Sequence, residues 1–204
     1  RVKETLEKDK DIAVVVAVHH ETGTGVLNPV REIGKLAHDY GCVFVVDTIS
    51  TYGLMPIRIE EDHIDFLMSS AQKGLAGMTG ASWLVGRIDE IVKSKAYPTR
   101  SYYCNLFMQY DFFERVGEMH FTPPVQTIYA LAQALKEYWE EGETARWVRL
   151  TRCWETIHNG LEAIGLASVV DKDIQGKLVV TVKAPDGDKF DFLKLHDYCF
   201  ERGF

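Results

Sequence analysis

Short apolar segments, each followed by polar residues, constrain the fold of this 204-residue chain more than any other feature. Residues 12–18, 42–46 and 64–68 have the length of strands and consist largely of apolar, often β-branched side chains. Continuous apolar runs of this kind predict strands that are buried on both faces. A helical pattern that follows Pro29 and extends over residues 30–40 separates the first two strands. Strand, helix and strand at this spacing predict an α/β fold with a mostly parallel sheet.

The rest of the chain adds further elements to this pattern. Its apolar periodicity and its Gly and Pro residues predict a strand at 81–85, a short helix at 88–94, long helices at 125–141 and 144–164, a strand at 178–182 and a helix at 189–201. The aromatic stretch from Tyr97 to Phe113 indicates an irregular packed loop or a contact between subunits.

We expect two domains. Residues 1–143 should belong to a large α/β domain that includes a connecting helix, and residues 144–204 should begin a small α+β domain. The chain opens with a charged helical pattern and stops at Phe204, where a strand is expected to follow. It therefore has the character of a segment of a longer protein.

Composition argues against several classes of function. The formal net charge is −7, which disfavours nucleic acid as the main partner. The four cysteines are far apart and form no C-x-x-C pair, so a metal site or a redox motif has no support. No apolar run approaches the roughly 20 residues that span a bilayer, and no signal peptide opens the chain. We expect a cytoplasmic enzyme with no membrane partner.

Polar residues at the ends of the predicted strands are the candidate site. Ligands of parallel sheets bind beyond the carboxyl ends of the strands. Asp47 follows the second strand, and Lys73 follows the third within a segment of small residues. A lone aspartate after a strand is usually a turn residue, and a lone lysine is usually solvated. Together they place a carboxylate and an amine at one edge, with room for a bulky group beside the backbone.

Pyridoxal phosphate is a cofactor whose chemistry needs these two residue types. A lysine amine condenses with its aldehyde, and a carboxylate holds the proton on its pyridine nitrogen. Hydroxyl and amide donors must bind its phosphate and ring oxygen, and Ser70, Gln72 and Thr22 are suitably placed in the sequence for this. Ile49 could contact one face of the ring, although an ordinary core isoleucine fits the pattern equally well.

Three motifs resemble the class V aminotransferases of fold type I. They are His-His-Glu-Thr-Gly-Thr-Gly-Val-Leu-Asn-Pro at 19–29, Val-Val-Asp-Thr-Ile-Ser at 45–50 and Ser-Ser-Ala-Gln-Lys-Gly at 69–74. The resemblance runs through nearly the whole chain. The first motif and Phe-Thr-Pro-Pro at 121–124 are most similar to the subgroup that uses 2-aminoethylphosphonate and pyruvate. The resemblance implies part of the large domain of the pyridoxal-phosphate transferase fold.

The resemblance also implies catalytic and ring-binding roles by position. Lys73 is implied to hold pyridoxal phosphate as a Schiff base and to act as the general base of the reaction. Asp47 is implied to pair with the pyridine nitrogen. Thr22 corresponds to a residue that bonds the ring oxygen, and Ile49 to one that lies against the ring.

Further cofactor-binding roles follow from the same resemblance. Ser70 and Gln72 are implied to contact the phosphate. Thr122 matches a threonine that reaches the phosphate bound in the neighbouring subunit, so a homodimer with shared active sites is implied. His19 aligns near the cofactor, and a structural histidine is an equal alternative. The implied reaction is transfer of the amino group of 2-aminoethylphosphonate to pyruvate, which gives phosphonoacetaldehyde and alanine.

Alternatives remain open at this point. Gln72 stands where the 2-aminoethylphosphonate subgroup often has Asn, whereas alanine–glyoxylate and serine–pyruvate aminotransferases carry Gln. A cysteine desulfurase or lyase would need a mobile catalytic cysteine, for which Cys104 is the candidate. A non-catalytic doubly wound module is the alternative of another class, although the chain has neither of the common Gly-rich nucleotide motifs.

Overall fold

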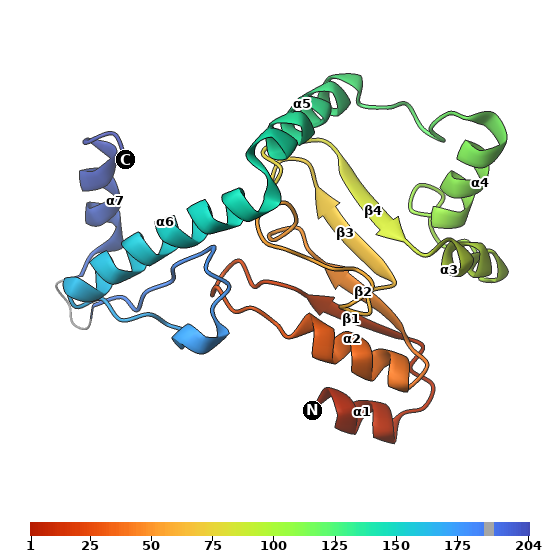
Figure 1. Cartoon of the computed structure of the whole chain (residues 1–204), viewed down its shortest axis with the longest axis horizontal. Coiled ribbons are helices and arrows are strands. Elements are labelled where there is room, and N and C mark those ends of the chain that lie inside the picture. Colours follow the sequence, from red (N-terminus) through yellow and green to blue (C-terminus); the bar gives the residue numbers. More distant parts are fainter. Residues whose placement is uncertain (186–189) are drawn as a thin grey trace.

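The computed structural model describes residues 1–185 and 190–204. In chain order its elements are α1 (Val2–Lys8), β1 (Val14–Val18), α2 (Val30–Asp39), β2 (Val43–Asp47), β3 (Phe66–Ser70), β4 (Ser82–Gly86), α3 (Ile88–Lys93), the 3-10 helix η1 (Ser94–Ala96), α4 (Leu106–Val116), α5 (Val125–Glu141), α6 (Glu143–Ala163), the 3-10 helix η2 (Lys172–Ile174) and α7 (Phe192–Phe200) (Figure 1).

The strands form one sheet in the order β1-β2-β3-β4. The first three strands are parallel, and β4 is antiparallel to β3. This arrangement confirms the predicted α/β fold with a mostly parallel sheet. Because β4 runs in the opposite direction, its amino end lies at the same edge as the carboxyl ends of β1, β2 and β3. The loop that joins β3 to β4 therefore begins and ends at the edge where ligands of such folds bind.

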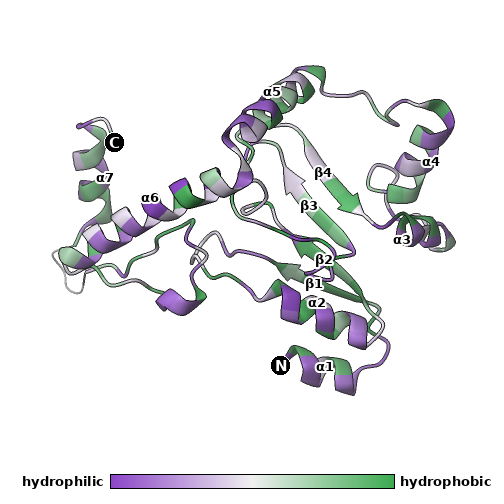
Figure 2. Cartoon of the chain, viewed as in Figure 1, coloured by the Kyte–Doolittle hydropathy of each residue, from purple (hydrophilic) through white to green (hydrophobic). Residues whose placement is uncertain are grey.

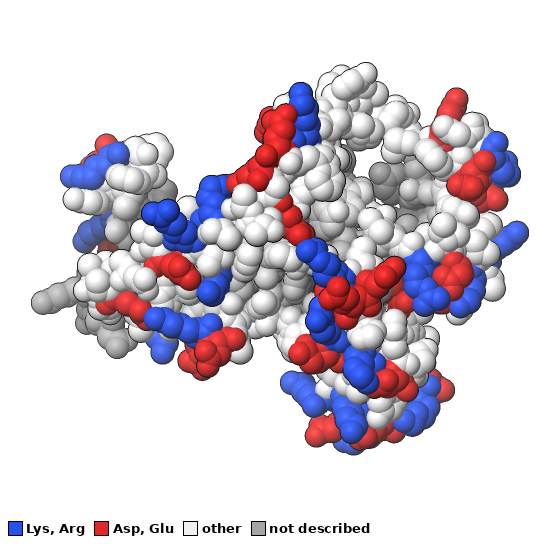
Figure 3. All heavy atoms as spheres, in the orientation of Figure 1, with Lys and Arg blue, Asp and Glu red and all other residues white. Residues whose placement is uncertain are grey.

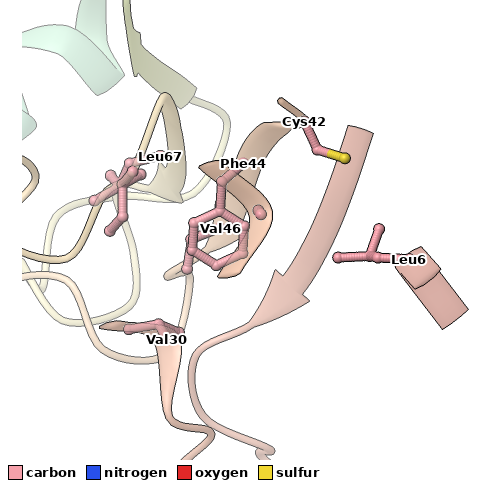
Figure 4. Close-up of a cluster of buried hydrophobic side chains, with 8 residues drawn as sticks. Leu6, Val30, Cys42, Phe44, Val46 and Leu67 are labelled. Atoms are coloured by element: carbon pink, nitrogen blue, oxygen red, sulfur yellow. The ribbon is translucent and has the colours of Figure 1, made fainter. Parts of the chain in front are cut away.

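One face of the sheet forms the core with α1 and α2. Apolar residues of α2 recur at helical spacing, so this helix presents an apolar stripe to the strands. Phe44, Val46 and Leu67 project from that face of the sheet and are fully buried (Figure 4). Burying each of these side chains contributes roughly 2 kcal/mol, so this cluster fixes which face of the strands turns inward. Figure 2 shows the same division, with hydrophobic strands beside an α2 of mixed character.

The opposite face of the sheet is open at β1 in the described part of the chain. Val14, Val16 and Val18 on β1 are 49%, 65% and 38% exposed. The prediction that the first strand is buried on both faces is therefore wrong for the part of the chain that the structure describes. The burial of β2 also alternates, since its second and fourth residues are buried and the others only half-buried. In the described chain, α1 and α2 pack against one face of β1. The residues of β1 that point to the other face are apolar as well, so the sequence predicted burial on both faces.

The aromatic stretch is more regular than predicted. Residues 106–116 form the helix α4, whose first turn is capped by the Asn105 side chain, which accepts a hydrogen bond from the Met108 backbone N–H at 2.9 Å. Gly117 ends the helix with a φ of 76°. The aromatic residues of α4 are half-buried or exposed, so they do not mark a single buried face from which the helix could be recognised. The helix predicted at 88–94 is confirmed as α3.

The two long predicted helices are confirmed as α5 and α6 (Figure 1). The strand predicted at 178–182 is wrong, because only an isolated bridge between Ser168 and Val182 forms there. Two backbone hydrogen bonds flank this bridge, at 169–181 and 183–167, and they are too few for a ladder. The helix predicted at 189–201 is α7, and residue 189 lies outside the described residues.

Two observations concern the length of the helices and the charges on one face of the surface. Across residues 1–185 and 190–204, no helix combines the length and the apolar character needed to cross a bilayer. On the face shown in Figure 3, acidic and basic side chains are mixed instead of being separated into patches of one sign. A basic patch of the kind that binds nucleic acid is not seen on that face.

Candidate active site

Asp47 and Ser70 project from the same face of neighbouring strands. Asp47 is the last residue of β2, and it is paired with Val18 on β1 and Met68 on β3. Ser70 lies two residues beyond Met68, and side chains two residues apart in a strand share a face. That face is the one opposite α2. The register therefore places a carboxylate and a hydroxyl on one side of the sheet, at adjacent strand ends.

The Asp47 carboxylate is held by its own turn. Its Oδ1 accepts a hydrogen bond from the Ile49 backbone N–H at 2.8 Å, and its peptide oxygen accepts one from the His19 N–H at 2.8 Å. Among the described residues, Oδ2 has no hydrogen-bond partner. The side chain is half-buried, so one carboxylate oxygen is available to a ligand while the other fixes the side-chain orientation.

The Ser70 hydroxyl is buried without a partner. The residue is 8% exposed, and its Oγ forms no hydrogen bond with any described residue. A buried hydroxyl in this state costs about 1–3 kcal/mol relative to a satisfied one. Unsatisfied groups of this kind are uncommon in folded proteins, and a bound ligand is one way to satisfy them.

Lys73 lies on the loop between β3 and β4, which is closed by backbone hydrogen bonds. The Ala71 N–H donates to the Ala81 oxygen at 3.0 Å, and the Gly77 N–H donates to the Ala71 oxygen at 2.8 Å. The Ala76 N–H donates to the Lys73 oxygen at 2.9 Å, which makes a tight turn in which Ala76 has a φ of 60°. These hydrogen bonds fix the backbone of the loop. Gln72 and Lys73 are exposed, so both side chains remain accessible.

His19 is buried beside the end of β2. Its Nδ1 lies 3.0 Å from the Thr51 hydroxyl oxygen, and the residue is 6% exposed. Burial lowers the pKa of His19 to about 4, an effect that Asp62 partly opposes and His20 reinforces. The imidazole is therefore neutral near pH 7, and its hydrogen bond to Thr51 joins β1 to the turn after β2.

Thr22 and Thr122 lie on exposed segments outside the strands. Thr22 is in a turn after β1 that is closed by a 2.7 Å bond from the Gly25 N–H to the Glu21 oxygen. Thr122 precedes α5 and is exposed. In the part of the chain that the structure describes, no hydrogen bond links either threonine to the strand ends. The structure thus groups His19, Asp47, Ile49 and Ser70, places Thr22, Gln72 and Lys73 on adjoining loops, and leaves Thr122 apart.

Sequence reasoning missed two hydroxyl residues in the turn after β2. The Thr48 Oγ1 donates to the Met68 oxygen at 2.9 Å, and the Thr51 Oγ1 lies 3.3 Å from the Thr48 oxygen. Both threonines are fully buried. Their spacing of three residues directly after a strand is typical of a hydroxyl-stabilised turn and could have identified them.

A second carboxylate lies at the opposite end of the sheet. Asp65 directly precedes β3, and its side chain is 3% exposed. It accepts hydrogen bonds from the Phe44 N–H at 2.7 Å, from His38 Nε2 at 2.9 Å and from Arg87 Nη1 at 3.0 Å. Burial raises the pKa of Asp65, but these three hydrogen bonds outweigh it and hold the pKa below its ordinary value. This carboxylate is fully engaged in joining α2, β2, β3 and β4.

The mostly parallel sheet, with Asp47 and Lys73 after neighbouring strands, agrees with the class of fold that the sequence motifs indicated. Residues 2–197 match the family model described as aminotransferase class-V. The chain belongs to the class V aminotransferase family.

Curated relatives within this family are similar to nearly all of the chain. A 2-aminoethylphosphonate–pyruvate transaminase of Salmonella typhimurium is 34% identical over 98% of this chain and 54% of its own length. A bifunctional phosphonoacetaldehyde hydrolase/aminoethylphosphonate transaminase of Clostridioides difficile is 34% identical over 100% of this chain and 32% of its own length. The chain therefore spans about half the length of the first relative and a third of the second.

Solved structures agree with the fold. Alanine–glyoxylate aminotransferase from Nostoc sp. superimposes with a TM-score of 0.87 at 29% identity, covering 99% of this chain and 53% of that structure. Pyridoxamine–pyruvate aminotransferase from Mesorhizobium loti gives a TM-score of 0.83 at 28% identity, covering 91% of this chain and 48% of that structure. These similarities confirm the predicted family and the transferase fold.

Proposed function

We propose that the full-length protein is a pyridoxal-phosphate-dependent aminotransferase that transfers the amino group of 2-aminoethylphosphonate to pyruvate. Phosphonoacetaldehyde and alanine are the products. One observation carries the proposal: Asp47 and Ser70 share a face of adjacent strands at the ligand-binding edge, and Lys73 follows three residues beyond Ser70. The names of the 34% identical relatives support the choice of substrates.

The residues at this edge fit pyridoxal phosphate. The cofactor needs an amine, a carboxylate for its pyridine nitrogen and donors for its phosphate. Lys73 offers an exposed amine, and Asp47 offers an oxygen that has no hydrogen bond among the described residues. The Ser70 hydroxyl is buried and has no hydrogen-bond partner among the described residues, as expected of a donor that binds a phosphate oxygen. Small residues around Lys73 leave space for the ring.

Each residue contributes a distinct part of the chemistry. When bound, pyridoxal phosphate supplies an aldehyde that combines with amines and a ring that accepts electrons from the substrate carbon. Asp47 holds a proton at the pyridine nitrogen. The Lys73 amine takes a proton from the substrate carbon and delivers one to the cofactor carbon, as a general base and then a general acid. Neutral His19 keeps the turn after Asp47 in place through Thr51.

The surrounding residues bind and shield the cofactor. Ser70 and Gln72 bind the phosphate, and Thr22 donates to the ring oxygen. Ile49 is half-buried and shares the turn of Asp47, so its side chain is placed to exclude water from one face of the ring.

The proposal includes a homodimer in which Thr122 reaches the phosphate bound in the partner subunit. Thr122 is exposed and follows Phe121, whose ring centroid lies 4.8 Å from that of Tyr103 and 5.6 Å from that of Tyr102. These tyrosines are 67% and 62% exposed. Exposed aromatic residues are typical of protein interfaces and support contact with a second copy.

The proposal also divides the chain into two domains, with residues 1–143 in the large domain and 144–204 in the small one. The direction of α6, which extends away from the sheet, supports this division (Figure 1).

The proposal is tested on the full-length protein with and without added pyridoxal phosphate. We expect the wild type to show a near-visible absorption band and to convert pyruvate to alanine fastest with 2-aminoethylphosphonate in a screen of amines. Lys73→Ala should lose the band and slow amino transfer by about 10²–10⁴-fold, since it removes the general base. Lys136→Ala, a surface substitution on α5, should leave both unchanged. A wild-type protein that takes up no pyridoxal phosphate would disprove the proposal.

A related transaminase is the second candidate. Gln72 and the 29% identical Nostoc structure favour an alanine–glyoxylate activity. Glycine formation from alanine and glyoxylate that exceeds alanine formation from 2-aminoethylphosphonate and pyruvate would support it. Cys104 is exposed, so a desulfurase is tested in the same assay by sulfide release from cysteine and by its loss in Cys104→Ser.

A further inference from the structure

Two loops cross in backbone contact next to Lys73. One is the turn after β2, which contains Gly53, and the other is the loop after β3, which contains Gly74. A Cβ on Gly74 would overlap the Tyr52 backbone oxygen, and a Cβ on Gly53 would lie 2.8 Å from Leu75 Cδ2. Gly53 also has a φ of 77°, which favours glycine. The loop that follows Asp47 and the loop that carries Lys73 therefore depend on each other for their positions.

Arg146 of α6 binds both loops at this crossing. Its Nη1 donates to the Gly74 oxygen at 3.1 Å and to the Gly53 oxygen at 3.4 Å. The guanidinium group is oriented from two further sides, because its Nε donates to Glu141 Oε2 at 2.6 Å and its carbon lies 5.0 Å from the centre of the Tyr138 ring. The side chain is 11% exposed. A charged donor held in this way makes stronger hydrogen bonds to carbonyl groups than a neutral one does.

We propose that Arg146 is a positioning residue for Lys73, which it holds in register with Asp47 by joining the carbonyl groups of Gly53 and Gly74. The Gly74 carbonyl lies in the peptide that joins Gly74 to Leu75, so displacement of this peptide moves the Cα of Gly74 and is passed to Lys73 through the preceding peptide bond. The proposal rests on the proposed function for its catalytic consequence. The connection between the two loops is a property of the chain itself, whatever ligand it binds.

Arg149 provides a matched control. It lies one helical turn after Arg146 and donates to both oxygens of the same Glu141, at 2.6 and 3.1 Å. Hydrogen bonds from Arg149 and then from Arg146 lower the pKa of Glu141 to about 2. The Arg149 side chain is 55% exposed, and its described hydrogen bonds do not reach either loop. A merely structural role in pairing with Glu141 would make the two arginines equivalent, whereas a positioning role distinguishes them.

The test compares Arg146→Gln, Arg146→Lys and Arg149→Gln in the full-length protein. The first readout is hydrogen exchange of the cofactor-free protein at the amides of Ala76 and Gly77, which are hydrogen-bonded within the Lys73 loop. We expect at least about tenfold faster exchange in Arg146→Gln, an intermediate rate in Arg146→Lys and no change in Arg149→Gln. Exchange of α2 amides should stay at the wild-type rate, which separates loop displacement from general loss of stability.

The second readout is function. Arg146→Gln should weaken pyridoxal phosphate binding and lower kcat, each by about tenfold or more, while the KM for the amine changes less than about threefold. Arg146→Lys should restore part of both, because it retains one cationic donor. Equal effects of Arg146→Gln and Arg149→Gln, or unchanged loop exchange in Arg146→Gln, would overturn the proposal. Faster loop exchange in a protein that binds no pyridoxal phosphate would reject the proposed function and leave the loop connection established.

Discussion

The two ends of the sheet each contain an aspartate, and the surroundings of the two side chains differ. Asp65, at the amino end of β3, accepts hydrogen bonds from three groups on β2, α2 and the segment after β4. Asp47, at the carboxyl end of β2, accepts one side-chain hydrogen bond among the described residues, from the next turn of its own loop. The two carboxylates thus belong to one sheet, but Asp65 has three hydrogen bonds to its side chain and Asp47 has one among the described residues.

We infer from this difference in hydrogen bonding that Asp65 has a structural role and that Asp47 is suited to bind a ligand. A carboxylate whose hydrogen-bonding capacity is filled by the protein stabilises the fold and has no capacity left for a ligand. A carboxylate that is oriented by one bond and otherwise free retains its capacity for binding. The same contrast holds for Ser70, whose buried hydroxyl is unsatisfied among the described residues, at the same edge as Asp47. The comparison yields four predictions, from the largest expected effect to the smallest.

Asp47→Ala should impair catalysis without unfolding the protein. Removal of an electrostatic partner of the reacting group lowers kcat by about 10²–10³-fold, or about 3–4 kcal/mol of barrier. The half-buried side chain makes few contacts, so the free energy of unfolding should change by less than about 1 kcal/mol. Steady-state kinetics and chemical denaturation measure the two effects. A variant with nearly wild-type turnover would remove Asp47 from the site.

As the pH falls, the contribution of His19 to the free energy of unfolding should be lost at a higher pH than the contribution of Asp65. The pKa of His19 is lowered from 6.5 to about 4, so the unfolded chain binds more protons than the folded chain between these values. Stability is fully present above about pH 6.5 and falls by roughly 3 kcal/mol as the pH drops to 4. The lowered pKa of Asp65 acts in a separate window, because its contribution is lost as the pH falls below about 4.

Urea denaturation of the cofactor-free protein at several pH values measures both windows. His19→Gln should remove most of the change between pH 6.5 and 4, with the remaining slope assigned to His20, whose pKa burial also lowers. Asp65→Asn should alter the profile only at the acid end. A wild-type profile that is flat between pH 6.5 and 4 would show that His19 is not buried as a neutral imidazole.

Asp65→Ala should have the reverse effect of Asp47→Ala. Loss of the buried carboxylate leaves the Phe44 N–H, the His38 Nε2 and the Arg87 guanidinium group without their partner, which costs about 2–3 kcal/mol of stability. The figure is at the low end for a buried pair, because Arg87 is 52% exposed and its pairing is screened by solvent. In the folded fraction kcat should be unchanged. Asp89→Ala, which removes the exposed partner of the same arginine, should leave stability nearly unchanged, because solvent screens the pair.

Ser70→Ala should give the smallest effect of the four. It should weaken cofactor binding without lowering the free energy of unfolding. Removal of an unsatisfied buried hydroxyl should leave the free energy of unfolding unchanged or raise it by up to about 1 kcal/mol. Loss of a hydrogen bond to a charged phosphate should weaken pyridoxal phosphate binding by about tenfold. Cofactor titration and thermal unfolding measure the two. A clear loss of stability with unchanged cofactor affinity would make Ser70 a structural residue.

Local sequence patterns were sufficient for the sheet and for locating polar residues at the carboxyl ends of its strands, whereas the roles of these residues stay predictions. Strands, α2 and the two long helices each have a period that reflects one packing surface, and Asp47 and Lys73 follow strands directly. The strand expected at 178–182 did not form because strands depend on a neighbour, and apolar content alone does not supply one. Helix α4 was missed because its aromatic residues are spread around the helix.

Contacts between distant segments could not be predicted from the sequence. Arg146 lies 72 positions from Gly74 in the chain, and nothing in the local sequence of α6 distinguishes it from Arg149. Similarly, Asp65 is a single residue before a strand, and its three hydrogen bonds come from segments 21 to 27 positions away. Such residues are identified by the register and by the packing of helices against loops, which emerge only when the chain is folded.

The reversed direction of β4 has a thermodynamic consequence for ligand binding. Because the strand returns to the edge that β3 has just reached, the segment carrying Lys73 is tied at its base by the bond between Ala71 and Ala81. The conformational entropy of this segment is thus lost when the protein folds. A ligand that arrives later does not have to order the backbone again, so more of its interaction energy is retained as affinity.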